Sequence, residues 1–218
     1  MKPFSLKSLL PTAALLLGIS SHSYADDSLK RGFYVFQNVC MDCHGMTEAH
    51  YGDMAALGVP LSSLKKWAEG RHASLEDPIA SPFPTIEAAK ASFGGDVPPD
   101  MSLLARQIKG GGSYIEAMLT SYKPAPEGYK LAPKAYYNEV ALTHHKIFRM
   151  PSPFMKETIT YPDGMVADIP QMAHDVSLFL DWAAEPQGHH RRFYGTATLL
   201  YLFVMLGLLL GLKKTIWK

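Results

Sequence analysis

The chain has 218 residues, a formal net charge of +1 and two cysteines, and this length suits one domain of ordinary size with a buried core. Its charge is uneven, because all 20 acidic residues lie between Asp26 and Glu185, where only 14 Lys and Arg oppose them. This region therefore carries a charge of −6, which argues against nucleic acid as a partner and suits a basic one. Solubility alone is the alternative explanation, and composition does not decide between them.

The first 25 residues predict an export signal that is removed from the mature protein. Two lysines precede an apolar run at Leu9–Ile19, and the small residues Ser23 and Ala25 fit an export peptidase. A buried first helix is the alternative, but Pro11 interrupts the apolar run. We therefore expect cleavage after Ala25.

Apolar residues at helical spacing predict a first helix that leads into the segment holding both cysteines. Leu29, Phe33, Phe36 and Cys40 recur at this spacing. Asp26 or Ser28 is the expected cap of this helix, and Gly45 its expected end.

The middle of the chain predicts short helices separated by loops. Proline and glycine clusters interrupt residues 45–100 and leave room only for short helices over WAEG and TIEAAKA. A helix from Met101–Gln107 is broken by three glycines, and Ser113 is the expected cap of the next helix, Tyr114–Tyr122. Five prolines in residues 123–155 predict mainly ordered loop.

A hairpin and a longer helix close the predicted soluble domain. Glu157–Tyr161 alternates in polarity and is followed by the turn sequence PDG. Asp168 can cap the last helix, Pro170 suits its first turn, and Pro186 and Gly188 should end it. The expected core face of this helix consists of Met172, Val176, Phe179, Leu180 and Ala183.

Phe193–Leu212 predicts a single membrane anchor. These twenty residues hold no charge, and at 1.5 Å per residue they span roughly 30 Å, the thickness of the hydrocarbon core of a bilayer. Basic residues flank the stretch on both sides, among them Lys213 and Lys214. A buried core helix would not explain an apolar circumference bracketed by charges.

The two ends together predict four segments and a topology. They are a signal peptide at 1–25, an exported domain at 26–190, an anchor at 193–212 and a tail at 213–218. Export places the domain in the periplasm and the tail in the cytoplasm, across a bacterial inner membrane. The three lysines of the tail agree with the positive-inside rule.

The stretch VCMDCHG holds both cysteines, and its C-x-x-C-H pattern is typical of covalent c-type haem attachment. Thioethers from Cys40 and Cys43 would hold one porphyrin edge, and His44 would bring an imidazole under the iron. A disulfide at this spacing closes a tiny loop and stabilises little. A thioredoxin-like pair needs a βαβ setting, and structural zinc usually needs four ligands. We therefore expect one covalently bound haem with His44 as the fifth ligand.

The sixth ligand decides the redox type. Methionine would favour ferrous iron and raise the potential. Met150 precedes Pro151 in RMPSPF, which biases its backbone to an extended form and favours it as the ligand. Met155 is a nearby competitor, and His144 and His145 would give bis-histidine ligation. An open site would indicate gas binding or peroxidase chemistry, so the residues alone leave these alternatives open.

Blocks in a fixed order carry a resemblance to cytochrome c1, the haem subunit of the quinol–cytochrome c reductase (cytochrome bc1) complex. The blocks are KRGFYVFQNVCMDCHGM, VPPDMSLLAR, GGGSYIEAMLTSYKPAPEGY, RMPSPF and TYPDGMVADIPQMAHDVSLFLDWAAEPQGHHRRFYG, which together cover almost the whole mature chain. The resemblance implies a mainly α, class-I-cytochrome-c-like haem domain with long loops, a small hairpin and one C-terminal transmembrane helix. It also implies Cys40, Cys43, His44 and Met150 as the haem residues.

The resemblance further implies a haem pocket. Pro98 and Pro99 would line it, and Arg106 and Tyr114 lie in the block that packs near it. A turn, a surface charge and a core aromatic are the alternative roles of these residues. The sequence HHKIF before Arg149 departs from the family pattern, which leaves the pocket rim open.

The function that the resemblance implies is electron transfer without an enzymatic reaction of the chain's own. One electron at a time would pass from the Rieske iron–sulfur protein to cytochrome c. The implied partners are the cytochrome b and Rieske subunits, a cytochrome c acceptor and the lipid bilayer. A free-standing anchored cytochrome that shuttles electrons to a terminal oxidase would share every motif of the haem site. A haem sensor or peroxidase with an open sixth site is a third possibility.

Overall fold

The computed structural model describes residues 21–141, 146–154, 158–186 and 188–216. Most of the expected export signal lies outside these ranges. So do His144, His145 and Met155, the alternatives to Met150 as a ligand.

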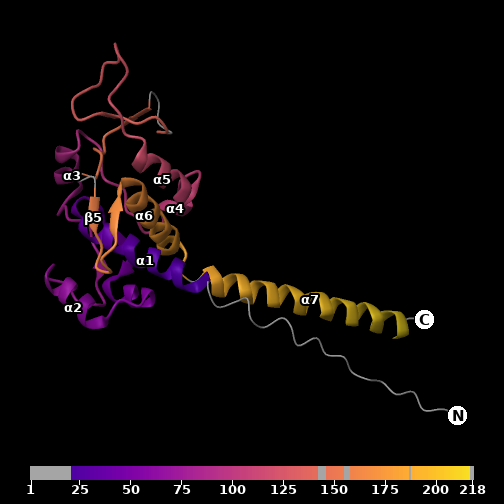
Figure 1. Cartoon of the computed structure of the whole chain (residues 1–218). Coiled ribbons are helices and arrows are strands. Elements are labelled where there is room, and N and C mark those ends of the chain that lie inside the picture. Colours follow the sequence, from indigo (N-terminus) through magenta and orange to yellow (C-terminus); the bar gives the residue numbers. More distant parts are fainter. Residues whose placement is uncertain (1–20, 142–145, 155–157, 187, 217–218) are drawn as a thin grey trace.

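Helices dominate the described chain, which confirms the mainly α fold class (Figure 1). The helices are α1 Ser21–Asn38, η1 Cys40–Asp42, η2 Tyr51–Leu57, α2 Leu61–Glu69, α3 Ile86–Ser92, α4 Leu104–Gln107, α5 Gly111–Thr120, α6 Ile169–Ala184 and α7 Gly188–Ile216. Short strands form antiparallel pairs between them. The strands are β1 Met46–His50 with β2 Pro78–Ile79, β3 Tyr136–Tyr137 with β4 Ile147–Phe148, and β5 Thr158–Thr160 with β6 Val166–Asp168.

The core forms where α1 crosses α6. Phe179 of α6 is fully buried, and its ring lies 5.5 Å from that of Phe36 and 5.7 Å from that of Phe33, both on α1. Gly32 lets the two helices approach closely, because a Cβ there would collide with the Asp175 main-chain carbonyl. Burying one such aromatic ring stabilises the fold by about 1.5–3 kcal/mol. The contact fixes α1, and therefore the cysteine segment that follows it.

The first helix begins and ends earlier than the sequence indicates. It starts at Ser21, before both expected caps, and it ends at Asn38 instead of Gly45. A 3-10 turn at Cys40–Asp42 replaces its last part, because the N–H groups of Cys43 and His44 both donate to the Cys40 carbonyl. The expected end at Gly45 is therefore wrong.

Helix α5 is the second departure from the sequence-based expectation. It begins at Gly111, its N-cap Gly110 has a positive φ of 98°, and Ser113 lies inside the helix and is exposed. The expected cap at Ser113 is wrong because a different helix supplies the acceptor. Asp181 of α6 accepts the Gly112 N–H at 3.0 Å, which satisfies one of the free donors at the start of the helix.

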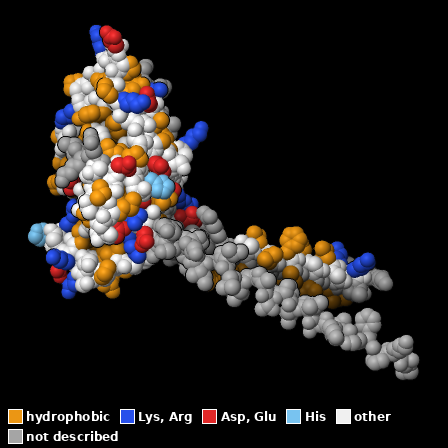
Figure 2. Space-filling model, viewed as in Figure 1, with side chains coloured by type: hydrophobic (Ala, Val, Ile, Leu, Met, Phe, Trp, Pro, Cys, Tyr) orange, Lys and Arg blue, Asp and Glu red, His pale blue; other side chains and the backbone are white. Residues whose placement is uncertain are grey.

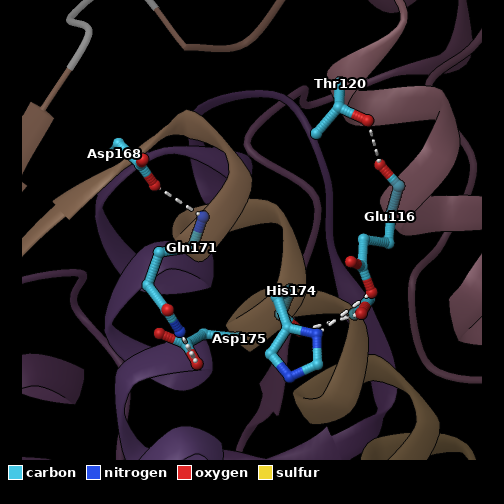
Figure 3. Close-up of polar contacts among 7 residues, drawn as sticks. Glu116, Thr120, Asp168, Gln171, His174 and Asp175 are labelled. Carbon is cyan, nitrogen blue, oxygen red and sulfur yellow. Dashed lines mark hydrogen bonds and ion pairs between the residues drawn. The ribbon is translucent and has the colours of Figure 1, made fainter.

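Figure 3 shows one polar contact that joins α5 to α6 and another that caps α6. The Glu116 carboxylate lies 3.1 Å from His174 Nδ1 across the two helices. Asp168 caps α6 and accepts the Gln171 N–H at 2.9 Å, which confirms the predicted cap. Helix α6 ends at Ala184.

The predicted hairpin is confirmed at β5 and β6. Thr158 pairs with Asp168 and Thr160 with Val166. The turn between the strands is tied to α1, since Arg31 Nε and Nη2 each lie 2.8 Å from Asp163 Oδ2. This ion pair sets the hairpin against α1, the helix that leads into the cysteine turn.

Helix α7 extends away from the rest of the domain (Figure 1). Phe193–Lys214 has a mean hydropathy of 2.1, and none of its most apolar window is buried. Hydrophobic side chains line the visible part of the helix, with blue basic groups near its end, in Figure 2. This helix fits a single-pass membrane anchor. Gly188, which we expected to end α6, begins α7 instead.

Candidate haem site

The C-x-x-C-H segment folds as one tight turn directly after α1. The Cys40 carbonyl accepts the N–H of Cys43 at 3.1 Å and that of His44 at 2.9 Å. Both cysteines are half-buried and carry free thiols. Burial raises the pKa of Cys40 to about 12 and also raises that of Cys43. Protonated thiols differ from the low-pKa thiolates of redox pairs.

His44 is buried, with only 6% of its surface exposed, and its ring orientation is fixed by one hydrogen bond. Nδ1 lies 2.8 Å from the Pro99 carbonyl oxygen, which can only accept, so Nδ1 carries the proton. The lone pair is then on Nε2, the atom free to bind a metal. Burial lowers the pKa of His44, which favours this neutral form. The tautomer therefore fits an axial ligand of haem iron.

Met150 is positioned through its main chain. It is half-buried against the core, and its carbonyl accepts the Tyr122 hydroxyl at 3.1 Å. The Tyr122 backbone pairs in turn with Asn138, a fully buried residue whose side chain donates to the Met118 carbonyl at 2.7 Å. The loop that carries Met150 is thereby joined to the end of α5.

Arg149, directly before Met150, adds a second attachment for this loop. Its Nη1 donates to the Pro133 carbonyl at 2.7 Å, and its Nε lies 3.9 Å from Asp96. This arginine directly follows HHKIF, the segment where the sequence departs from the family pattern. These contacts attach the loop that carries Met150 to the loop around Pro133.

The residues expected to line the pocket lie in different environments. Pro99 contacts His44 directly, and Pro98 beside it is half-buried. Tyr114 of α5 is half-buried. Burial raises the pKa of Tyr122, and the nearby Tyr114 raises the pKa of Tyr122 further. Arg106, in α4, is exposed.

Sequence reasoning missed the residues that position the expected ligands. Tyr122 acts on a main-chain carbonyl 28 residues later, and Asp100 accepts the N–H of Thr47, 53 residues earlier. No pattern of neighbouring residues in the sequence predicts contacts over such separations. The only signal was that both residues lie within the blocks that resemble the family.

The donor set fits haem better than a bare metal ion. Among the described residues, no group of three or more His, Cys, Asp or Glu is placed to hold an ion. Two thiols, one imidazole with a free Nε2 and one thioether are the groups that a covalently attached haem uses. A membrane-anchored cytochrome is the class of protein that this set and the apolar helix define.

Comparison with known proteins agrees with this class. The chain matches the model of the Cytochrome C1 family over residues 18–218, and it belongs to that family. It is 37% identical over 225 residues to cytochrome c1 of Rhodospirillum rubrum, covering 89% of this chain and 82% of that protein. It is 32% identical over 199 residues to a mitochondrial cytochrome c1 heme protein of Solanum tuberosum, covering 84% and 76%.

A fused relative extends the comparison. The chain is 30% identical over 230 residues to the cytochrome b/c1 protein of Bradyrhizobium diazoefficiens, covering 87% of this chain and 33% of that protein. The resemblance drawn from the sequence, to cytochrome c1 of the bc1 complex, is thus confirmed. Family membership implies a haem cofactor and a role in electron transport.

Proposed function

We propose that this chain carries one electron at a time from the Rieske iron–sulfur protein to cytochrome c within the bc1 complex. Family membership supports the complex, and the 2.8 Å contact between His44 Nδ1 and the Pro99 carbonyl carries the proposal for the haem. Bound haem supplies a one-electron couple, while the chain makes and breaks no substrate bond. It is a redox subunit and has no enzymatic reaction of its own.

Of the four proposed haem residues, two attach the porphyrin and two bind the iron. Cys40 and Cys43 attach the porphyrin through thioethers from one turn, which keeps the cofactor bound in an exported domain. His44 presents Nε2 to the iron because Nδ1 is held by Pro99. Met150 would supply a thioether ligand, from a loop held at its carbonyl by Tyr122. A His/Met pair raises the potential relative to two histidines.

The proposed placement follows from the two ends of the chain. Residues 26–190 form the exported haem domain on the periplasmic side, 193–212 cross the membrane, and 213–218 lie in the cytoplasm. The signal at 1–25 is removed. The apolar helix α7 and its basic end support this topology.

The proposed partners are the cytochrome b and Rieske subunits, a cytochrome c acceptor and the lipid bilayer. The fused cytochrome b/c1 relative supports the first of these. The charge of −6 on the exported region suits a basic acceptor. If electron transfer to the acceptor does not slow with rising salt, this charge plays no part in steering.

Purification of the chain from its own membrane tests the proposal. We expect a denaturing gel to show haem covalently bound to this chain, and Cys40→Ala with Cys43→Ala to abolish it. We also expect co-elution with a b-type cytochrome and an iron–sulfur protein. A haem protein that elutes alone would favour a free-standing electron shuttle. Ready binding of carbon monoxide to the reduced protein would indicate an open sixth site.

A further inference from the structure

Hydrogen bonds join the segment that ends in Ser102 to the segment that follows His44. The Met101 N–H donates to the Gly45 carbonyl at 2.8 Å. The Glu48 N–H donates to Ser102 Oγ at 2.9 Å, and Ser102 is only 2% exposed. These two hydrogen bonds, together with those that Asp100 accepts from Thr47 and Ser102, are called the ligand clamp, because they hold the segment that follows the proposed ligand His44. The clamp is separate from the four residues proposed to bind haem.

Asp100 lies at the centre of the ligand clamp and uses both carboxylate oxygens. Oδ2 accepts the Thr47 N–H at 2.8 Å, and Oδ1 accepts the Ser102 N–H at 2.9 Å. Partial burial raises the pKa of Asp100, but the hydrogen bonds to Ser102 and Thr47 outweigh it and hold the pKa below its usual value. The carboxylate therefore joins one segment to the other while also bridging its own turn.

The backbone links Asp100 to the proposed haem ligand. The Pro99 carbonyl that holds His44 belongs to the peptide unit between Pro99 and Asp100, and that unit is planar. The proline ring fixes φ of Pro99, so the direction of the Pro99 carbonyl is left to ψ of Pro99 and φ of Asp100. The clamp fixes Asp100, the residue on the other side of this unit. The direction of the Pro99 carbonyl therefore depends on the carboxylate of Asp100.

We propose that Asp100 is a positioning residue for the haem, acting on the His44 ligand through the Pro99 carbonyl. This inference rests on the proposed function, because it takes His44 as the axial ligand. A well-aligned Nδ1–H···O bond makes Nε2 a stronger donor, and a stronger donor favours ferric over ferrous iron. Loss of the Asp100 carboxylate misaligns the carbonyl and shifts the couple toward ferrous iron, which raises the potential.

The surroundings of Asp100 provide a matched control. Thr47, Glu48, Asp100 and Ser102 border an open depression of about 200 Å³. Glu48 borders the same depression, and only its main-chain N–H contributes to the clamp. Glu48→Gln therefore removes one negative charge nearby and leaves the clamp intact. Since the depression is open, water can occupy the space left by truncating Asp100.

The experiment is a redox titration of the haem in the purified full complex, with Asp100→Ala, Asp100→Asn and Glu48→Gln. We expect the equilibrium constant for reduction to rise up to about tenfold in Asp100→Ala, which is about 59 mV for a one-electron couple. Asp100→Asn should shift it less, because its amide oxygen still accepts one of the two N–H groups. Glu48→Gln should leave it unchanged. Hydrogen exchange at the Thr47 and Ser102 amides should quicken only in the Asp100 variants.

Two results would overturn the inference: unchanged potentials in both Asp100 variants, or equal shifts in all three variants, which would reveal an effect of charge alone. If Asp100→Ala fails to accumulate, Asp100→Asn carries the test together with Ser102→Ala, which removes the acceptor of the Glu48 N–H. A wild-type chain without haem would refute the proposed function itself. Normal haem content with unaltered potentials in the Asp100 variants would refute only the role of Asp100.

Discussion

The hydroxyl of Tyr122 offers a quantitative test of how the loop of the proposed sixth ligand is held. Tyr122→Phe removes the 3.1 Å hydrogen bond to the Met150 carbonyl and leaves the ring in place. A neutral hydrogen bond contributes about 0.5–1.5 kcal/mol, and 1.4 kcal/mol is a factor of ten. If that bond restrains Met150 on the iron, the state without the Met150–iron bond becomes about twofold to tenfold more populated.

Titration of the ferric complex with imidazole measures this population. Imidazole binds only when Met150 has left the iron, so its apparent Kd should fall by the same twofold to tenfold. Tyr136→Phe is the matched control, since Tyr136 lies on β3 and is 38% exposed. An unchanged Kd in Tyr122→Phe would refute the role of this hydroxyl. A Kd as low as that of Met150→Leu would show that the variant loses the ligand outright.

Three further changes test the fold. Phe179→Ala should cost about 3–5 kcal/mol in unfolding free energy, measured by heating the complex, because the ring is fully buried between α1 and α6. Gly112→Ala should destabilise the domain by about 1–3 kcal/mol, because the new Cβ meets the Asp181 carboxylate, whereas Gly195→Ala on α7, whose Cβ meets nothing within 4 Å, should not destabilise it. Burial raises the pKa of Asp175, so the folded state holds its proton more tightly than the unfolded state. Stability should then decline as pH rises above the ordinary carboxyl value of about 4, and Asp175→Asn should flatten that decline in urea unfolding.

Features that depend on neighbouring residues were predictable. The cap at Asp168 and the hairpin β5–β6 follow from short patterns whose partners are a few residues away. The apolar helix α7 follows from composition alone. Each of these features is confirmed because its driving force is local: a turn, a cap or an uninterrupted apolar surface.

Features that depend on distant partners were not predictable. Ser113 has the right chemistry for a cap, yet Asp181, 69 residues from Gly112, takes that role. The helix expected from Met101 starts instead at Leu104, and the Met101 N–H donates to the distant Gly45 carbonyl. For the site, C-x-x-C-H predicted the proposed haem residues Cys40, Cys43 and His44, but not the groups that hold them in place. The acceptor of the His44 proton is a main-chain carbonyl 55 residues away, and nothing in a side-chain pattern marks it.

The close crossing of α1 and α6 at Gly32 has a consequence for evolution of the loops. Helix α1 ends two residues before Cys40, and α6 ends four residues before α7 begins. The route from the cysteine turn to α6 therefore runs through this one helix crossing and avoids the long loops. Insertions or deletions in those loops can therefore reshape the surface of the domain, while the α1–α6 crossing keeps the start of the cysteine turn in place.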